Sequence, residues 1–161
     1  MYHSVVWCET GMRRGNGGLC KGSYVLLLKN NRARKITVGK LGVPLFCKGF
    51  YAYIGSMFGP GGLEARIKRH LCSKKRKHWH VDYVLKYMRV EAVYILPGKD
   101  LESHLSRRAV KLYDHFKGFG CSDKIGDKSH LIYLKNRGEV KEFTRLLACA
   151  GFKKHKVSTF S

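Results

Sequence analysis

The chain has 161 residues, and its 32 Lys and Arg residues outnumber 11 Asp and Glu residues, which gives a formal net charge of +21. Such a charge costs a small folded protein self-repulsion, and a polyanionic partner compensates for it. A hydrophobic content of 44% excludes a disordered basic tail, in which apolar residues would be scarce. We therefore expect a folded protein that binds nucleic acid, with an acidic membrane surface or the ribosome as the weaker alternatives.

The length of the chain and the absence of a linker indicate one domain over residues 1–161. Single domains commonly have roughly 100–200 residues, and no repeat or proline-rich linker divides this chain. No apolar run approaches the ~20 residues of a membrane span, and the N-terminus lacks the pattern of a signal peptide. We expect a cytoplasmic protein with no membrane partner.

The six cysteines are spread along the chain, and no two are closer than twelve positions. This spacing excludes a C-x-x-C zinc or redox pair. We expect buried free thiols, and disulfides of the kind found in the cytoplasm of thermophiles remain the alternative.

The first half of the chain predicts three strands and a helix. A β-rich run at 22–30 is followed by strand-like stretches within 34–46, which glycines and a proline interrupt, and by a third strand at 48–56. After Gly61 the period changes, because Leu63, Ile67 and Leu71 fall at i, i+4 and i+8 of a helix.

The second half alternates between helices and strands. Asp100 is a candidate N-cap for a helix whose apolar face extends to Phe116. The other expected elements are a basic loop at 73–79, a short helix at 80–88, a strand at 89–96, a loop at 117–128, a strand at 129–136 and a helix at 138–152. The mixture predicts an α+β fold with a small central, mostly antiparallel sheet flanked by helices.

Two tyrosines and two cationic side chains form a candidate site. If the strands at 22–30 and 48–56 are neighbours, Tyr24 and Tyr53 lie close together near the start of the following helix. On that helix Arg66 and His70 are four residues apart, so we expect them to project outward from one face. Such a patch suits phosphodiester hydrolysis, in which a guanidinium stabilises the charge on phosphorus and a base takes a proton from water.

A carboxylate is the missing part, since hydrolysis of this kind uses a divalent cation. Glu102 is the best placed candidate, because it falls in the first turn of a helix at the border of its core face. The other acids considered lie in less suitable elements: Glu64, Glu91 and Glu142.

The run at 73–80 is the candidate surface for nucleic acid. No acid lies between Glu64 and Asp82, and an aromatic residue suited to base stacking stands beside the basic cluster. A metal pair of His80 with Asp82 is a weaker possibility. The predicted contacts are Arg69, Lys74, Lys75, Arg76, Lys77, His78, Trp79 and His80.

Three segments resemble the GIY-YIG nuclease superfamily: Gly22-Ser23-Tyr24, Tyr53-Ile54-Gly55 and LEARIKRH at 63–70. The stretches HWHVDYVL, ILPG and GFGCSDK are similar to an archaeal branch described as domain of unknown function 123, some members of which are fused to endonuclease III-type repair domains. The resemblance covers most of a core at about 20–135, followed by a C-terminal helix and basic tail at 138–161.

The resemblance implies metal-dependent hydrolysis of DNA. Tyr24 would be the general base and Tyr53 would bind the nucleophile or phosphate, while Arg66 would stabilise the charge on phosphorus. His70 would support the tyrosines, and Glu102 would bind Mg²⁺ or Mn²⁺. Because a tyrosine has a pKa of ~10, we expect nearby cations to lower the pKa of Tyr24.

Two features depart from the family pattern. The tyrosine motifs lie farther apart than is usual, so we expect segment 31–47 to form an inserted hairpin. Where many family members have a late asparagine, this sequence has Asp127, Ser129 and His130, to which we assign no role.

The expected activity is that of a DNA endonuclease acting in repair on damaged, for example abasic, or branched DNA, without a small-molecule cofactor and with a functional link to an endonuclease III-type enzyme. Two alternatives remain open. One is a nucleic-acid-binding module without catalysis, which recognises DNA or structured RNA through residues 66–80 and the tail GFKKHKVSTFS. The other is a lyase that cuts abasic DNA through a lysine Schiff base.

Overall fold

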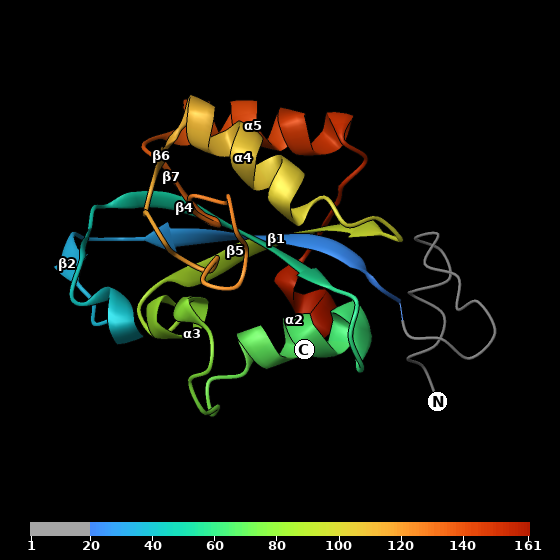
Figure 1. Ribbon diagram of the computed structural model, residues 1–161, viewed down its shortest axis with the longest axis horizontal. Coiled ribbons are helices and arrows are strands. Elements are labelled where there is room, and N and C mark those ends of the chain that lie inside the picture. Colours follow the sequence, from blue (N-terminus) through green and yellow to red (C-terminus); the bar gives the residue numbers. More distant parts are fainter. Residues whose placement is uncertain (1–19) are drawn as a thin grey trace.

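A six-stranded antiparallel sheet forms the centre of the computed structural model, which describes residues 20–161 (Figure 1). The strand order is β6-β7-β4-β1-β5-β8. The three long strands are β1 (Gly22–Asn30), β4 (Gly49–Met57) and β5 (Arg89–Pro97), and the shorter ones are β7 (Leu131–Leu134), β6 (Asp114–His115) and β8 (Lys153–His155).

Helices cover both faces of the sheet (Figure 1). One face packs against α2 (Gly62–Leu71), α3 (His80–Val84) and the short helix η2 (Val157–Phe160), and the other against α4 (Glu102–Leu112) and α5 (Arg137–Cys149). Side chains alternate between faces along a strand, so residues 24–28 of β1 contribute buried apolar side chains to both cores. The α+β fold and its mostly antiparallel central sheet are confirmed.

A hairpin is inserted between β1 and β4, as the sequence predicts. It pairs β2 (Arg34–Lys35) with β3 (Leu45–Phe46), and the helical turn η1 (Gly39–Leu41) lies between them. The buried amide of Asn30 donates to the carbonyl oxygens of Phe46 and Cys47 at 3.2 and 2.9 Å. This side chain therefore ties the hairpin to the end of β1.

One predicted helix is shorter in the structure than the sequence indicates, and the C-terminal tail forms regular elements. Helix α4 stops at Leu112 because Tyr113 is extended and the chain enters β6, so the ring of Phe116 leaves the helix and stacks on Phe46 with centroids 4.4 Å apart. The basic tail is ordered, because its residues form β8 and η2 and bury Phe160 in the core on the α2 side.

The expectation for the cysteines is half confirmed. The five cysteines in residues 20–161 carry free thiols, but Cys47, Cys72 and Cys149 are exposed, since they lie in connecting segments or at the end of α5. Cys8 lies outside the described residues. Within the part of the chain that the structure describes, no helix has the length and apolar character needed to cross a membrane.

Candidate active site

The site lies at the end of β4 that extends beyond its neighbour β7. Strand β7 pairs with β4 only from Phe50 to Tyr53, and the amide of Ile54 makes a last bond of 2.9 Å to the carbonyl of His130. Beyond this point the β7 side of β4 is open, and the first turn of α4 approaches it: the hydroxyl of Ser56 donates to a carboxylate oxygen of Glu102 at 3.0 Å. Side chains from both helical layers can therefore meet at this edge.

Tyr24 and Tyr53 come together as the sequence predicts. Tyr24 is opposite Gly55 in the register, and Tyr53 is opposite Leu26, so both rings lie on the α2 side of the sheet with centroids 6.4 Å apart. A Cβ atom at position 55 would stand 2.5 Å from Cζ of Tyr24. Glycine is therefore needed there, because any side chain would displace the Tyr24 ring.

His70 points into the protein, which corrects the expectation that it faces outward. It is 2% exposed, and its Nε2 atom is 2.8 Å from the hydroxyl of Tyr24. The buried positions Leu63, Ile67 and His70 have the spacing i, i+4 and i+7, which is one face of a helix. Thus the histidine belongs to the core stripe of α2.

Asp82 lies behind His70. Its fully buried carboxylate is 3.6 Å from the Nδ1 atom of His70 and accepts hydrogen bonds from Arg69 and from the backbone amides of His78 and Trp79. Burial alone would raise the pKa of Asp82, but the donors around it hold that pKa well below its usual range. The carboxylate is therefore charged and favours a proton on Nδ1, which leaves Nε2 to accept from Tyr24.

Burial dominates the titration of the three aromatic groups. It raises the pKa of Tyr24 and of Tyr53 above the ordinary value, and Arg66 offsets this only in part. The expectation that cations lower the pKa of Tyr24 is therefore wrong. Burial also lowers the pKa of His70, although Asp82 acts in the opposite direction. A neutral imidazole thus faces a protonated phenol.

Arg66 is held at the wall of an open pocket of about 470 Å³, whose lining includes Ser56, Met57 and Trp79. The guanidinium carbon lies 4.0 Å from the ring centroid of Trp79, and a guanidinium nitrogen donates to the sulfur of Met57 at 3.1 Å. Arg69 approaches the same indole at 4.1 Å. The tryptophan therefore positions Arg66 from the side.

Glu102 sits in the first turn of α4 and is 8% exposed. Its Oε2 atom is 3.0 Å from the hydroxyl of Ser56 and 3.2 Å from the ammonium of Lys124. Among residues 20–161, no group of three His, Cys, Asp or Glu side chains is arranged to hold a metal. The carboxylate nevertheless fits Mg²⁺ or Mn²⁺, because such ions are commonly held by one or two carboxylates together with water and substrate phosphate.

Sequence reasoning assigned no role to His130 and Asp127, yet His130 lies beside Glu102 and Asp127 binds His130. The Nδ1 atom of His130 is 3.5 Å from Oε1 of Glu102, and its Nε2 atom is 2.9 Å from Asp127. Asp127 also accepts hydrogen bonds from Ser103 and Arg107 at 2.6 and 2.7 Å. These bonds hold the pKa of Asp127 below its usual range, although burial acts against them.

The predicted nucleic-acid contacts divide into two groups. Half of them have partners inside the protein: Arg69 and Trp79 as described, Lys75 donating to the carbonyl of His70, and His80 accepting from the amide of Gly120. The others are exposed, although Lys77 lies over the ring of Tyr83 and the ring of His78 packs edge-on against Trp79: Lys74, Arg76, Lys77 and His78. His80 and Asp82 bind different partners in the structure, the amide of Gly120 and the groups around His70 respectively.

The fold and site are those of an α+β domain with a tyrosine–histidine pair beside a carboxylate. A family model described as Domain of unknown function DUF123 matches residues 23–150. The chain belongs to this family. Comparisons with curated proteins and with solved structures found no match. The matched region includes Tyr24, Tyr53, His70, Glu102 and His130.

Proposed function

We propose that the protein is a metal-dependent endonuclease of GIY-YIG type that hydrolyses phosphodiester bonds in DNA, acting in repair on damaged, for example abasic, or branched DNA. The observation that carries this proposal is the 2.8 Å contact between the hydroxyl of Tyr24 and Nε2 of His70, within reach of Arg66 and Glu102. The net charge of +21 supports DNA as the substrate.

The proposed proton path runs from water to Tyr24 and on to His70. Because burial raises the pKa of Tyr24, a resident phenolate is disfavoured, and the phenol takes the proton of water as it gives its own proton to Nε2. Asp82, 3.6 Å from Nδ1, stabilises the imidazolium that forms. The carboxylate and the histidine have the roles that they have in a hydrolytic triad, but here the hydroxyl relays the proton of water and is not itself the nucleophile.

The remaining residues handle charge and position. Arg66 would neutralise charge that develops on the phosphate, and its contact with Trp79 reduces the cost of orienting it. Tyr53 would hydrogen-bond the attacking water or the phosphate. Mg²⁺ or Mn²⁺ at Glu102 would supply a Lewis acid for the phosphate oxygens.

The test is cleavage of labelled intact, flapped and abasic duplexes with Mg²⁺, Mn²⁺ or EDTA at matched salt. We expect nicking that needs metal, with losses of about 10²–10⁴-fold in Glu102→Ala and Tyr24→Phe and nearly unchanged DNA affinity, since the basic surface supplies binding. Glu142→Ala, an exposed carboxylate on α5, is the control. Tight binding without nicking by the unaltered protein would leave a binding module only.

A Schiff-base lyase is the second candidate, because one lysine has the required surroundings. The side chain of Lys75 is 11% exposed, and burial lowers its pKa although Asp82 opposes this. Borohydride trapping on abasic DNA in EDTA tests it. A covalent complex that is lost in Lys75→Gln and kept in Lys74→Gln would favour the lyase over metal-dependent hydrolysis.

A further inference from the structure

His130 has an unpartnered nitrogen in a buried position. Its side chain is 1% exposed, and Nδ1 has no hydrogen-bond partner among residues 20–161. The carboxylate oxygen Oε1 of Glu102 lies 3.5 Å from it. A buried polar atom of this kind costs stability unless something binds it.

We infer that His130 and Glu102 are two ligands of one divalent transition-metal ion, with Nδ1 and Oε1 as the donor atoms and Mn²⁺ preferred over Mg²⁺. The catalytic role of this ion rests on the proposed nuclease function, whereas the binding of the ion does not. The nitrogen ligand is the new element, because a carboxylate alone would select for hard ions such as Mg²⁺.

The distance between the two donor atoms fits a shared ion. Two ligands at about 2.1 Å from one ion stand about 3.0 Å apart in octahedral coordination and about 3.4 Å apart in tetrahedral coordination. The separation of 3.5 Å between Nδ1 of His130 and Oε1 of Glu102 is close to the tetrahedral value and exceeds the octahedral value, which Mn²⁺ ordinarily takes, by about 0.5 Å. Octahedral binding of Mn²⁺ would therefore draw the two side chains closer together by that amount.

The surrounding hydrogen bonds leave these two atoms for a metal. Asp127 occupies Nε2 of His130 at 2.9 Å, so the ring proton belongs on Nε2 and the lone pair on Nδ1. The hydroxyl of Ser56 donates to Oε2 of Glu102, and the ammonium of Lys124 lies 3.2 Å from the same oxygen, whereas Oε1 is the atom that faces Nδ1 of His130. The pattern is a carboxylate–histidine–metal arrangement, which usually raises the basicity of the ligand.

The supporting carboxylate is itself held in place. Asp127 is fully buried in its side chain and accepts from Ser103 at 2.6 Å and from Arg107 at 2.7 Å. Lys124 is 35% exposed in its side chain, so solvent and a phosphate group can reach the ion from that direction. The rival interpretation is an ion pair between a doubly protonated His130 and the two carboxylates.

Metal binding by the full chain without DNA separates these interpretations. The protein is titrated with Mn²⁺, and binding is followed by electron paramagnetic resonance. Pulsed spectra are then recorded for two samples of the unaltered protein, one with ordinary ¹⁴N histidine and one with ¹⁵N-labelled histidine. We expect a nitrogen hyperfine coupling that changes with the isotope, and binding that weakens by at least the roughly 10–100-fold known for outer-shell changes in His130→Gln. His104→Gln, an exposed residue of α4 near Glu102, is the control.

Loss of fold cannot imitate the isotope result, because it uses the unaltered sequence. A bound Mn²⁺ without nitrogen coupling, or equal Mn²⁺ affinity in the unaltered protein and His130→Gln, would overturn the inference in favour of an ion pair. Nitrogen-coupled Mn²⁺ in a protein that cleaves no DNA would support the metal site and reject the nuclease proposal. Cleavage by a protein that shows no nitrogen coupling would do the opposite.

Discussion

At the scale of single residues, the contacts from Asp82 to His70 and from His70 to Tyr24 link a charged carboxylate to a phenol through one imidazole. The carboxylate stays charged because Arg69 and two backbone amides bind it. The imidazole stays neutral because burial outweighs the carboxylate. The two opposing influences on His70 make its protonation sensitive to changes at Asp82.

Cleavage should therefore fall on the acid side as pH drops through the lowered pKa of His70, because a protonated imidazole cannot accept the Tyr24 proton. Asp82→Asn removes the influence that raises this pKa, so the acid limb should move to lower pH. Rate against pH and the NMR titration of the His70 ring protons measure both effects. In the control Asp114→Asn, which changes an exposed acid on β6, neither the acid limb of the rate profile nor the His70 titration should move. An acid limb that stays in place in Asp82→Asn would contradict the proposed proton path.

The same pKa shifts of His70 and Asp82 determine how the free energy of unfolding changes with pH. Since the folded pKa of His70 lies below the unfolded value of about 6.5, the unfolded state takes up the proton first and the free energy of unfolding decreases as pH falls below that value. The depressed pKa of Asp82 adds stability that is present above the unfolded pKa of about 3.9 and is lost as pH falls below it.

At the scale of elements, the segment between α2 and α3 is folded back onto α2. Asp82 draws the amides of His78 and Trp79 inward, and the indole then lies against the guanidinium groups of Arg66 and Arg69. A basic run that looks like a solvated loop in sequence thus supplies a wall of the site.

Removing the indole should weaken both the fold and the reaction. Each cation–π contact contributes about 0.5–2 kcal/mol, so Trp79→Ala should lower the free energy of unfolding by about 1–3 kcal/mol and release Arg66, which reduces kcat more than DNA affinity. Urea unfolding and single-turnover cleavage measure these quantities. Trp79→Phe, which keeps an aromatic face, should retain most of both; an unchanged cleavage rate in Trp79→Ala would show that Arg66 needs no such support.

Periodicity was sufficient to predict the main elements. Alternation and turn residues located β1 and β4, and the i, i+4 spacing located α2, so the pairing of Tyr24 with Tyr53 followed from adjacent strands. The burial of His70 can also be predicted, because it lies seven residues after Leu63 on the same helix face. The contact of His130 with Glu102 cannot be predicted in this way, because a loop and a helix start that are far apart in sequence leave no periodic signal of their contact.

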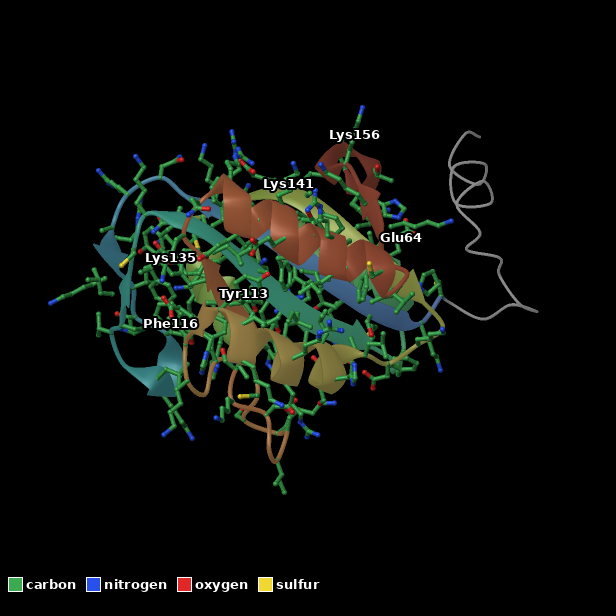
Figure 2. The ribbon with its side chains drawn as sticks, turned by 90° about the horizontal axis from the view of Figure 1, so that it is seen from above. Glu64, Tyr113, Phe116, Lys135, Lys141 and Lys156 are labelled. Atoms are coloured by element: carbon green, nitrogen blue, oxygen red, sulfur yellow. The ribbon has the colours of Figure 1, made fainter. Side chains whose placement is uncertain are left out.

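At the scale of the whole molecule, the net charge of +21 acts on stability and on binding in opposite ways. Basic side chains, including the exposed Lys135, Lys141 and Lys156, extend from different sides of the body (Figure 2). Their mutual repulsion disfavours the compact state, whereas their attraction to phosphates favours the complex.

Added salt should therefore raise the midpoint of thermal unfolding of the free protein and weaken DNA binding. For 6–10 phosphate contacts, affinity falls about 10³–10⁵-fold between about 50 and 200 mM salt. Calorimetry in a KCl series and fluorescence anisotropy on an abasic duplex test the two trends. A midpoint that does not rise with KCl would mean that charge repulsion is not a significant cost in this fold.

The central position of β1 also has a consequence for synthesis. This strand is apolar on both faces and pairs with β4 on one side and β5 on the other, but it leaves the ribosome before either partner. At about 5–20 residues per second, β5 follows only several seconds later. During that interval a long apolar strand lacks half of its pairing, and residues 22–30 are where we expect a chaperone to engage the nascent chain.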